Sequence, residues 1–165
     1  MVMKTHPQDR SSKQVVETTK GCEHTVYLVS CVSQKQAESA LGRELYVSVW
    51  FRKAQDYVEA LGCPWFILSA EYGLVSPDQV IAPYEKTLNA MLVSARRQWA
   101  IRVLAQLDEV VPNLSQVVFL AGKRYREFLE GHLRNHNIGV SVPMDGLRIG
   151  EQLSWLSRNT GFLTG

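Results

Sequence analysis

Several short stretches of this sequence bring together side chains that can do chemistry. The first stretch combines a hydroxyl, a thiol and an amine within six positions, at Ser30, Cys31 and Lys35. A thiolate is a strong nucleophile, and a nearby cation favours the deprotonated form. Cys31 is therefore a candidate catalytic residue, with simple packing at a strand end as the alternative. Ser30 and Lys35 are candidate ligand contacts.

The second stretch places hydroxyls and a carboxylate around a glycine. Ser69, Tyr72 and Tyr84 can hydrogen-bond a ligand, and the tyrosine rings can stack on a base or a sugar. Gly73 indicates a special backbone angle or the close approach of another group, and it joins the candidate binding residues. Glu71 is a candidate general acid or base, with a solvated loop position as the alternative.

The third stretch opens a predicted helix with Gly122, Lys123, Arg124 and Tyr125, all candidate binding residues. The free N–H groups and partial positive charge at a helix N-terminus suit a phosphate or a carboxylate. Basic side chains in a first turn oppose the helix dipole, so Lys123 and Arg124 indicate an anion, with solvation of both as the alternative. The sequence contains neither GxxxxGK[ST] nor GxGxxG, which excludes a P-loop and a dinucleotide fingerprint.

The fourth stretch places Asp145 before another predicted helix. Asp145 either caps that helix or faces a ligand as a candidate catalytic carboxylate. Gly146 and Gly150 bracket the helix start and complete the candidate binding residues. His132 and His136 share a helix face but have no Glu or Cys partner nearby, so we expect a solvated helix end and no metal site. No cofactor motif is present, and no cofactor is predicted.

Alternating strands and helices must position these stretches. Apolar runs predict buried strands at 25–31 and 64–69, a third strand at 116–121 and a short fourth strand at 139–143. Apolar periodicity predicts four helices, at 50–61, 94–110, 122–133 and 147–156, the second capped by Ser94. This order predicts an α/β fold with a mainly parallel sheet of about four strands and helices on both faces. Ligands of such sheets bind beyond the carboxyl ends of the strands, where all four stretches fall.

The length and composition of the sequence are those of a globular protein of about one domain. The chain has 165 residues, of which 45% are hydrophobic and 21% are charged, so we expect a flexible tail at 1–24 and one α/β domain at 25–165. A net charge of +2 does not by itself indicate nucleic-acid binding. The absence of a long apolar run and of a secretory signal predicts a cytoplasmic protein without a membrane partner. The three cysteines form no CxxC pair, so reduced thiols are expected.

The motifs also resemble a large, mostly uncharacterised group of bacterial and phage proteins. The shared patterns are S-C-x-x-x-K at 30–35, L-Y-x-S-x-x-F-R-K-A at 45–54, A-G-x-x-Y at 121–125 and G-L-x-I-G-x-x-L-x-W-L at 146–156. This resemblance spans residues 25–158. Residues 67–84, with S-x-x-Y-G-[LV]-[LV]-x-P and I-x-P-Y, resemble the YaaA peroxide-stress family. A weaker similarity links Tyr-Gly-Leu-Val-Pro to archaeosine-synthase-type domains with a uracil-DNA-glycosylase-like fold.

The resemblance implies a uracil-DNA-glycosylase-like core and a nucleobase, nucleotide or nucleic-acid partner. The leading hypothesis is an enzyme of glycosidic-bond cleavage or transfer, or of base modification. The alternative is a non-catalytic nucleic-acid-binding module of the YaaA type, acting in stress response or phage biology. Its basic face would be interleaved with Trp99 and Tyr125 and formed by Arg52, Lys53, Arg96, Arg97, Lys123, Arg124 and Arg126. A third hypothesis is a protein partner bound through residues 1–24.

Overall fold

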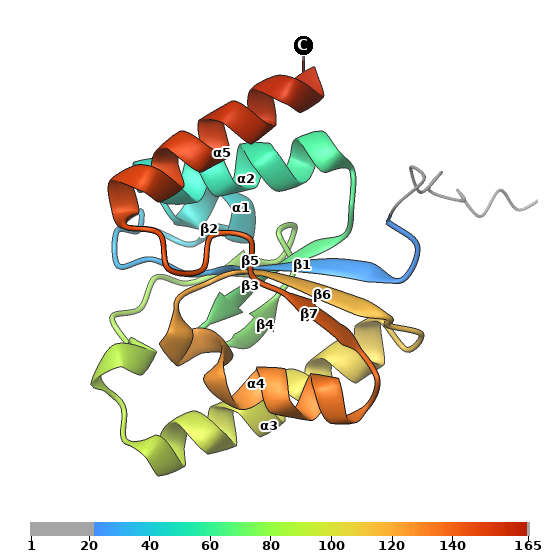
Figure 1. Ribbon diagram of the computed structural model, residues 1–165. Helices are drawn as coiled ribbons and strands as arrows, with labels where there is room; N and C mark the ends of the chain where they lie inside the picture. The colour runs from blue at the N-terminus through green and yellow to red at the C-terminus, as the bar shows by residue number, and fades with distance from the viewer. Residues whose placement is uncertain (1–21, 165) are drawn as a thin grey trace, which may run out of the picture.

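The predicted apolar strands lie side by side, which satisfies the backbone hydrogen bonds that their burial would otherwise leave unpaired. The computed structural model describes residues 22–164, so most of the predicted tail, residues 1–21, lies outside the described residues (Figure 1). The central sheet has the strand order β4-β3-β1-β6-β7. Its strands are β1 (Thr25–Ser30), β3 (Trp65–Ser69), β4 (Gly73–Val75), β6 (Gln116–Leu120) and β7 (Gly139–Ser141).

The mainly parallel sheet is confirmed, but it has five strands instead of about four. β1 pairs in parallel with β3 and β6, and β6 pairs in parallel with β7. The additional strand, β4, runs antiparallel to β3 and pairs Gly73 with Ser69 across a tight turn. β4 has only three residues, the first of them a glycine, which is too short for an apolar pattern, so the sequence did not predict it.

Small elements occupy the long connections on one side of the sheet. β2 (Ala40–Leu41) and β5 (Val80–Ile81) form a separate antiparallel pair. The short helix α1 (Gly42–Leu45) and the 3-10 turn η1 (Leu88–Ala90) complete these connections. None of the four was predicted, because each spans only about one period of its helical or strand pattern.

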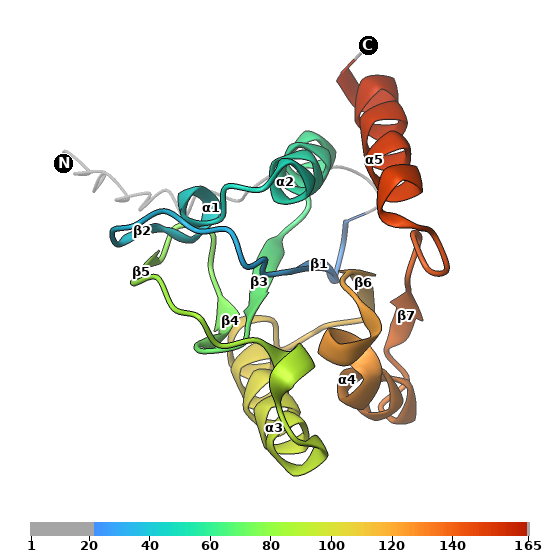
Figure 2. The same ribbon diagram turned by 90° about the vertical axis from the view of Figure 1, so that its left-hand side faces the viewer.

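The long helices cover both faces of the sheet, as predicted (Figure 2). The helices α2 (Val49–Leu61) and α5 (Ile149–Thr164) pack together on one face. The other face carries α3 (Val93–Val110) and α4 (Lys123–Asn135). The predicted cap of α3 is wrong, because its N-cap is Leu92 without a side-chain hydrogen bond, and Ser94 lies inside the helix. Within the described residues, none of the helices combines the length and the apolar character needed to cross a membrane.

The prediction that all three cysteines are reduced is wrong. Cys22 and Cys63 form a disulfide, with their Cα atoms 5.3 Å apart, and Cys31 is a buried free thiol. The two partners lie 41 residues apart in the chain, but they lie shortly before the neighbouring strands β1 and β3. Sequence spacing could not show this pairing, because it depends on which strands are neighbours.

Candidate functional site

Beyond the carboxyl ends of the neighbouring strands β1 and β6, the two connections run to opposite faces of the sheet. After β1 the chain leads to α2 on one face of the sheet, and after β6 it enters α4 on the other (Figures 1 and 2). Strands that send their connections to opposite faces leave a crevice between them, and ligands of open α/β sheets bind in such crevices. Two cavities lie at this place, within the size range of small-molecule sites.

The first cavity, here the Ser30 cavity, has a volume of about 480 Å³. It lies between the end of β1, the start of α4 and the loop from β7 to α5. It contains five of the predicted site residues, namely Ser30, Gly122, Lys123, Asp145 and Gly146. Trp50 from α2 and Gln152 from α5 close its other side.

The second cavity, here the Cys31 cavity, has a volume of about 660 Å³. The predicted site residues Cys31, Lys35 and Tyr125 line it. Glu85, Lys86, Thr87 and Asn89 form another wall of this cavity. Val32 and Ser33 line both cavities, so the chain leaving β1 is a shared wall and the two cavities adjoin.

The Cys31 thiol is held against the core at the edge of its cavity. It donates a hydrogen bond to the Tyr125 hydroxyl over 3.4 Å, and only 8% of Cys31 is exposed. The Tyr125 hydroxyl also accepts from the backbone N–H of Leu88 at 3.3 Å. Burial lowers the pKa of the Lys35 ammonium, while the neighbouring Cys31 and Glu85 act in the opposite direction. A thiol and a partly desolvated amine therefore share one cavity, as the first stretch predicted.

A network of hydrogen-bonded hydroxyl groups lies next to the Cys31 cavity. The Ser69 hydroxyl donates to that of Tyr84 over 2.8 Å, and the hydroxyls of Tyr84 and Tyr46 lie 2.7 Å apart. The Lys35 Nζ lies 4.4 Å from the centre of the Tyr84 ring, a cation–π contact. Burial raises the pKa of both Tyr46 and Tyr84, so these hydroxyls stay protonated. Ser69 and Tyr84 thus position the cavity without lining it.

The raised pKa of Tyr125 predicts that the protein loses folding stability at alkaline pH. Burial, and next the nearby Cys31, raise the pKa of Tyr125 to about 12. Unfolded tyrosines ionise near pH 10, so the folding stability from neutral Tyr125 is complete below about pH 10 and is lost as pH rises toward about 12. Urea unfolding near pH 9 and near pH 11 should show this loss. Tyr125→Phe should show a smaller loss, and an equal loss would contradict the assignment.

Glu71 and Tyr72 lie in the turn between β3 and β4, and Gly73 begins β4; none of the three lines either cavity. Gly73 has a φ of 75°, and an added Cβ would lie 2.3 Å from the Gln106 side chain. The close approach predicted for this glycine is therefore to the protein itself. Arg102 from α3 donates to the carbonyl oxygens of Glu71 and Tyr72, which fixes the turn, and the Glu71 side chain is exposed.

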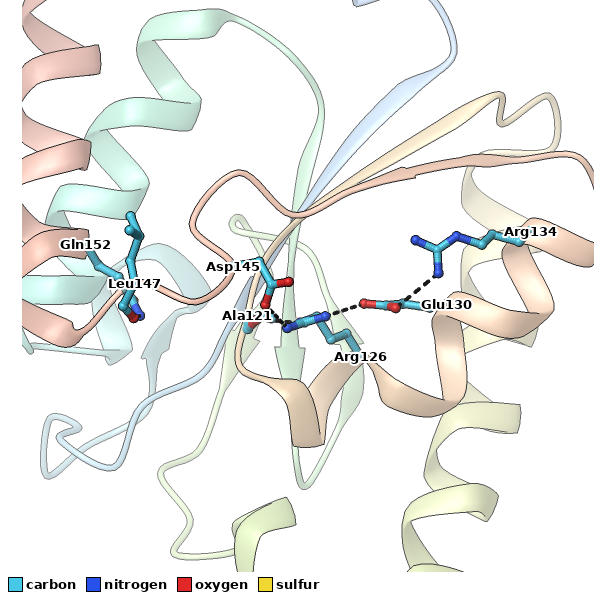
Figure 3. Close-up of polar contacts among 7 residues, drawn as sticks. All are labelled: Ala121, Arg126, Glu130, Arg134, Asp145, Leu147 and Gln152. Atoms are coloured by element: carbon cyan, nitrogen blue, oxygen red, sulfur yellow. Dashed lines mark hydrogen bonds and ion pairs between the residues drawn. The ribbon is translucent and has the colours of Figure 1, made fainter.

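Asp145 does not cap α5, which corrects the first of its two predicted roles. Its carboxylate lies 2.7 Å from the guanidinium of Arg126 (Figure 3). Arg126 also pairs with Glu130 at 2.6 Å and donates to the carbonyl of Ala121 at 3.2 Å. These contacts attach the β7–α5 loop to α4 and hold Asp145 at the Ser30 cavity. Its catalytic role stays a prediction.

The predicted basic face interleaved with aromatic rings is not formed. Trp99 and Tyr125 are buried and pack edge to face, with ring centres 5.9 Å apart. Arg96 is only 5% exposed and pairs with Glu127 at 3.1 Å. Arg52 and Lys53 lie on α2, across the sheet from the other basic residues. Helical periodicity alone could not show that Arg96 points into the core.

The remaining candidates lie away from the two cavities. Arg124 is half-exposed and 3.9 Å from Glu127, and Gly150 lies exposed in the first turn of α5. His132 and His136 are exposed at the end of α4, as expected, with their rings stacked 4.1 Å apart. Across residues 22–164, no group of three or more His, Cys, Asp or Glu side chains could hold a metal ion.

Sequence reasoning missed the wall of the Ser30 cavity that α2 and α5 provide. The Trp50 indole N–H donates to the Gln152 side-chain oxygen over 2.9 Å. The Gln152 side chain also donates to the Leu147 carbonyl at 2.9 Å, on the far side of the loop from Asp145 (Figure 3). Trp50 and Gln152 lie 102 positions apart in the chain, so no local pattern joins them.

Comparisons with known proteins identify relatives but no activity. The model of DUF6884, described as a family of unknown function, matches residues 26–158. The uncharacterized protein YfjM of Bacillus subtilis (strain 168) is 26% identical over 133 residues, which cover 76% of this chain and 83% of that protein. No solved structure matches. These findings confirm the resemblance to an uncharacterised group, while the relation to YaaA stays a prediction.

Proposed function

The chain belongs to the DUF6884 family of unknown function, and we propose that it is an enzyme acting on a nucleobase, a nucleoside or a nucleotide. One observation carries this proposal: two adjoining cavities at the carboxyl edge of the sheet share Val32 and Ser33 and collect the predicted site residues. Two linked compartments suit a ligand with two chemically different parts, such as a base and a sugar phosphate. The motif resemblance adds that the fold is of the uracil-DNA-glycosylase-like type.

The chemistry is divided between the two cavities. In the Cys31 cavity, the Cys31 thiol is the nucleophile, and Lys35 in the same cavity is a cationic contact for the ligand. In the Ser30 cavity, Asp145 is the general acid or base and the half-buried Trp50 offers an apolar ring to a base. This arrangement supports glycosidic-bond cleavage or transfer, or modification of the base.

The first test is a thermal-shift screen with free bases, nucleosides and nucleotides. A ligand at about 100 times its dissociation constant should add about 2.7 kcal/mol of stability, which raises the melting temperature by several degrees. Turnover of the ligand class that binds is then followed by chromatography. Cys31→Ser should keep binding and lower turnover by at least ~100-fold, because a hydroxyl is a far weaker nucleophile than a thiolate.

The control is Glu71→Gln, which changes an exposed carboxylate outside both cavities and should leave turnover unchanged. Undiminished turnover in Cys31→Ser would remove the thiol from the mechanism. Failure of all three ligand classes to raise the melting temperature would contradict the proposal itself.

A further inference from the structure

The Ser30 hydroxyl is a buried polar group with no partner in the protein. Ser30 is 9% exposed and ends the central strand β1, where it lines the Ser30 cavity. Among the described residues, the Ser30 hydroxyl makes no hydrogen bond, whereas every side-chain N or O atom that is completely shielded from solvent has a partner. The Ser30 hydroxyl oxygen is therefore not completely shielded, and it faces the cavity that Ser30 lines. An unpartnered hydroxyl in a nearly closed position indicates a ligand group that bonds to it.

The start of α4 presents backbone donors to the same cavity. The N–H group of Lys123, which lines the cavity, has no acceptor within its own helix, and no side chain caps the helix. The N–H group of Arg124 is the next free donor, although the Arg124 side chain does not line the cavity. The Tyr125 N–H is already bonded to the Gly122 carbonyl at 3.0 Å. A Cβ added to Gly122 would meet nothing within 4 Å, so the space before the helix is open.

The charges around the cavity favour an anion at this end. Two cations, Lys123 and Arg126, and one carboxylate, Asp145, line it. Arg126 and Asp145 neutralise each other at 2.7 Å, whereas Lys123 makes no ion pair or hydrogen bond among the described residues. The charge of Lys123 therefore adds to the partial positive charge of the helix N-terminus.

We propose that the inner end of the Ser30 cavity binds a phosphate group. The Ser30 hydroxyl, the N–H groups at the start of α4 and the Lys123 ammonium approach it from different directions, as a tetrahedral oxyanion with several acceptor oxygens requires. This inference rests on the proposed function for the rest of the ligand and narrows it: the substrate class is a nucleotide, not a free base or nucleoside.

The test begins with inorganic phosphate as the probe and the full-length protein. Amide resonances of Gly122, Lys123 and Arg124 should shift in a saturable titration followed by heteronuclear NMR. The variants Ser30→Ala and Lys123→Met should each weaken phosphate binding about tenfold, since hydrogen bonds and contacts to a charged group are lost. Lys123 is exposed, so its variant is expected to fold as the wild type does.

The matched control is Lys53→Met on α2, which removes a lysine outside both cavities and should leave phosphate binding within about twofold of wild type. Acetate is the competing anion, and binding equal to that of phosphate would replace the phosphate assignment with a carboxylate. Shifts that avoid the start of α4, or no effect of either variant, would overturn the inference.

A second titration separates this inference from the proposed function. A nucleoside 5′-monophosphate should bind at least ~10-fold more tightly than its nucleoside, and Lys123→Met should abolish that advantage. Equal affinities would overturn the phosphate site and leave a nucleoside-directed enzyme. Phosphate binding at Lys123 without any gain from an attached nucleoside would keep the site and contradict the nucleotide function.

Discussion

Replacing Trp99 with alanine is expected to lower the free energy of unfolding by about 3–5 kcal/mol, as for other large buried aromatic residues. Trp99 is 6% exposed and packs its ring edge to face against Tyr125. Its indole N–H donates to the carbonyl oxygen of Ser69 over 2.9 Å, at the carboxyl end of β3. The variant therefore removes a large apolar surface and leaves a buried carbonyl without its donor.

Two further variants separate these contributions in urea unfolding. Trp99→Phe keeps most of the ring and loses the indole donor, so its loss of stability should be clearly smaller. Ile101→Ala, two positions along the same helix, removes a side chain that is 68% exposed and should change stability by no more than about 0.5 kcal/mol. A loss below about 1 kcal/mol in Trp99→Ala would contradict the burial of this residue.

Tyr125 connects this packing to the candidate site. Its ring contacts Trp99, and its hydroxyl accepts from the Cys31 thiol. A loss of packing around Trp99 should therefore disturb the Cys31 cavity even though Trp99 lines neither cavity. Trp99→Phe largely retains the fold, so its ligand affinity can be measured and should be more sensitive than its stability to this disturbance of the cavity.

The sequence predicted the elements whose signal is local and continuous. The apolar runs at β1, β3 and β6 each contain enough β-branched and aromatic residues to identify a strand, whereas β7 is short and only partly buried. The rule for carboxyl ends then placed Cys31, Lys35 and Tyr125 at one edge, and the structure brings them to one cavity. That rule works because it needs only the direction of the strands.

Features that depend on neighbours in space were not predictable from one sequence. The polar pattern of α3 suggested an exposed Arg96, but Glu127 on α4 and the carbonyl of Met91 make its burial possible. The wall formed by Trp50 and Gln152 depends on the packing of α2 against α5. In each case the partner lies on an element whose position only the completed fold determines.

Removing the Cys22–Cys63 disulfide should lower the free energy of unfolding by roughly 4 kcal/mol. In the chain-entropy model, opening a loop of 41 residues restores entropy to the unfolded chain and stabilises the unfolded state by about this amount. Urea unfolding with and without reductant measures the difference, and the double variant Cys22→Ser, Cys63→Ser should reproduce the reduced value. The denatured protein should expose one titratable thiol without reductant and three with it, because Cys31 is free.

Cys31→Ser is the matched control for the disulfide. It should keep the full effect of the reductant on stability and lower each thiol count by one, since Cys31 is not part of the bond.

The disulfide precedes β1 and β3 at the amino edge of the sheet, whereas both cavities lie at the carboxyl edge. Reduction should therefore lower stability without changing the affinity for a ligand measured well below the melting temperature. Three thiols in the denatured protein without reductant would show that the bond is absent, and a changed affinity would show that the two edges of the sheet are coupled.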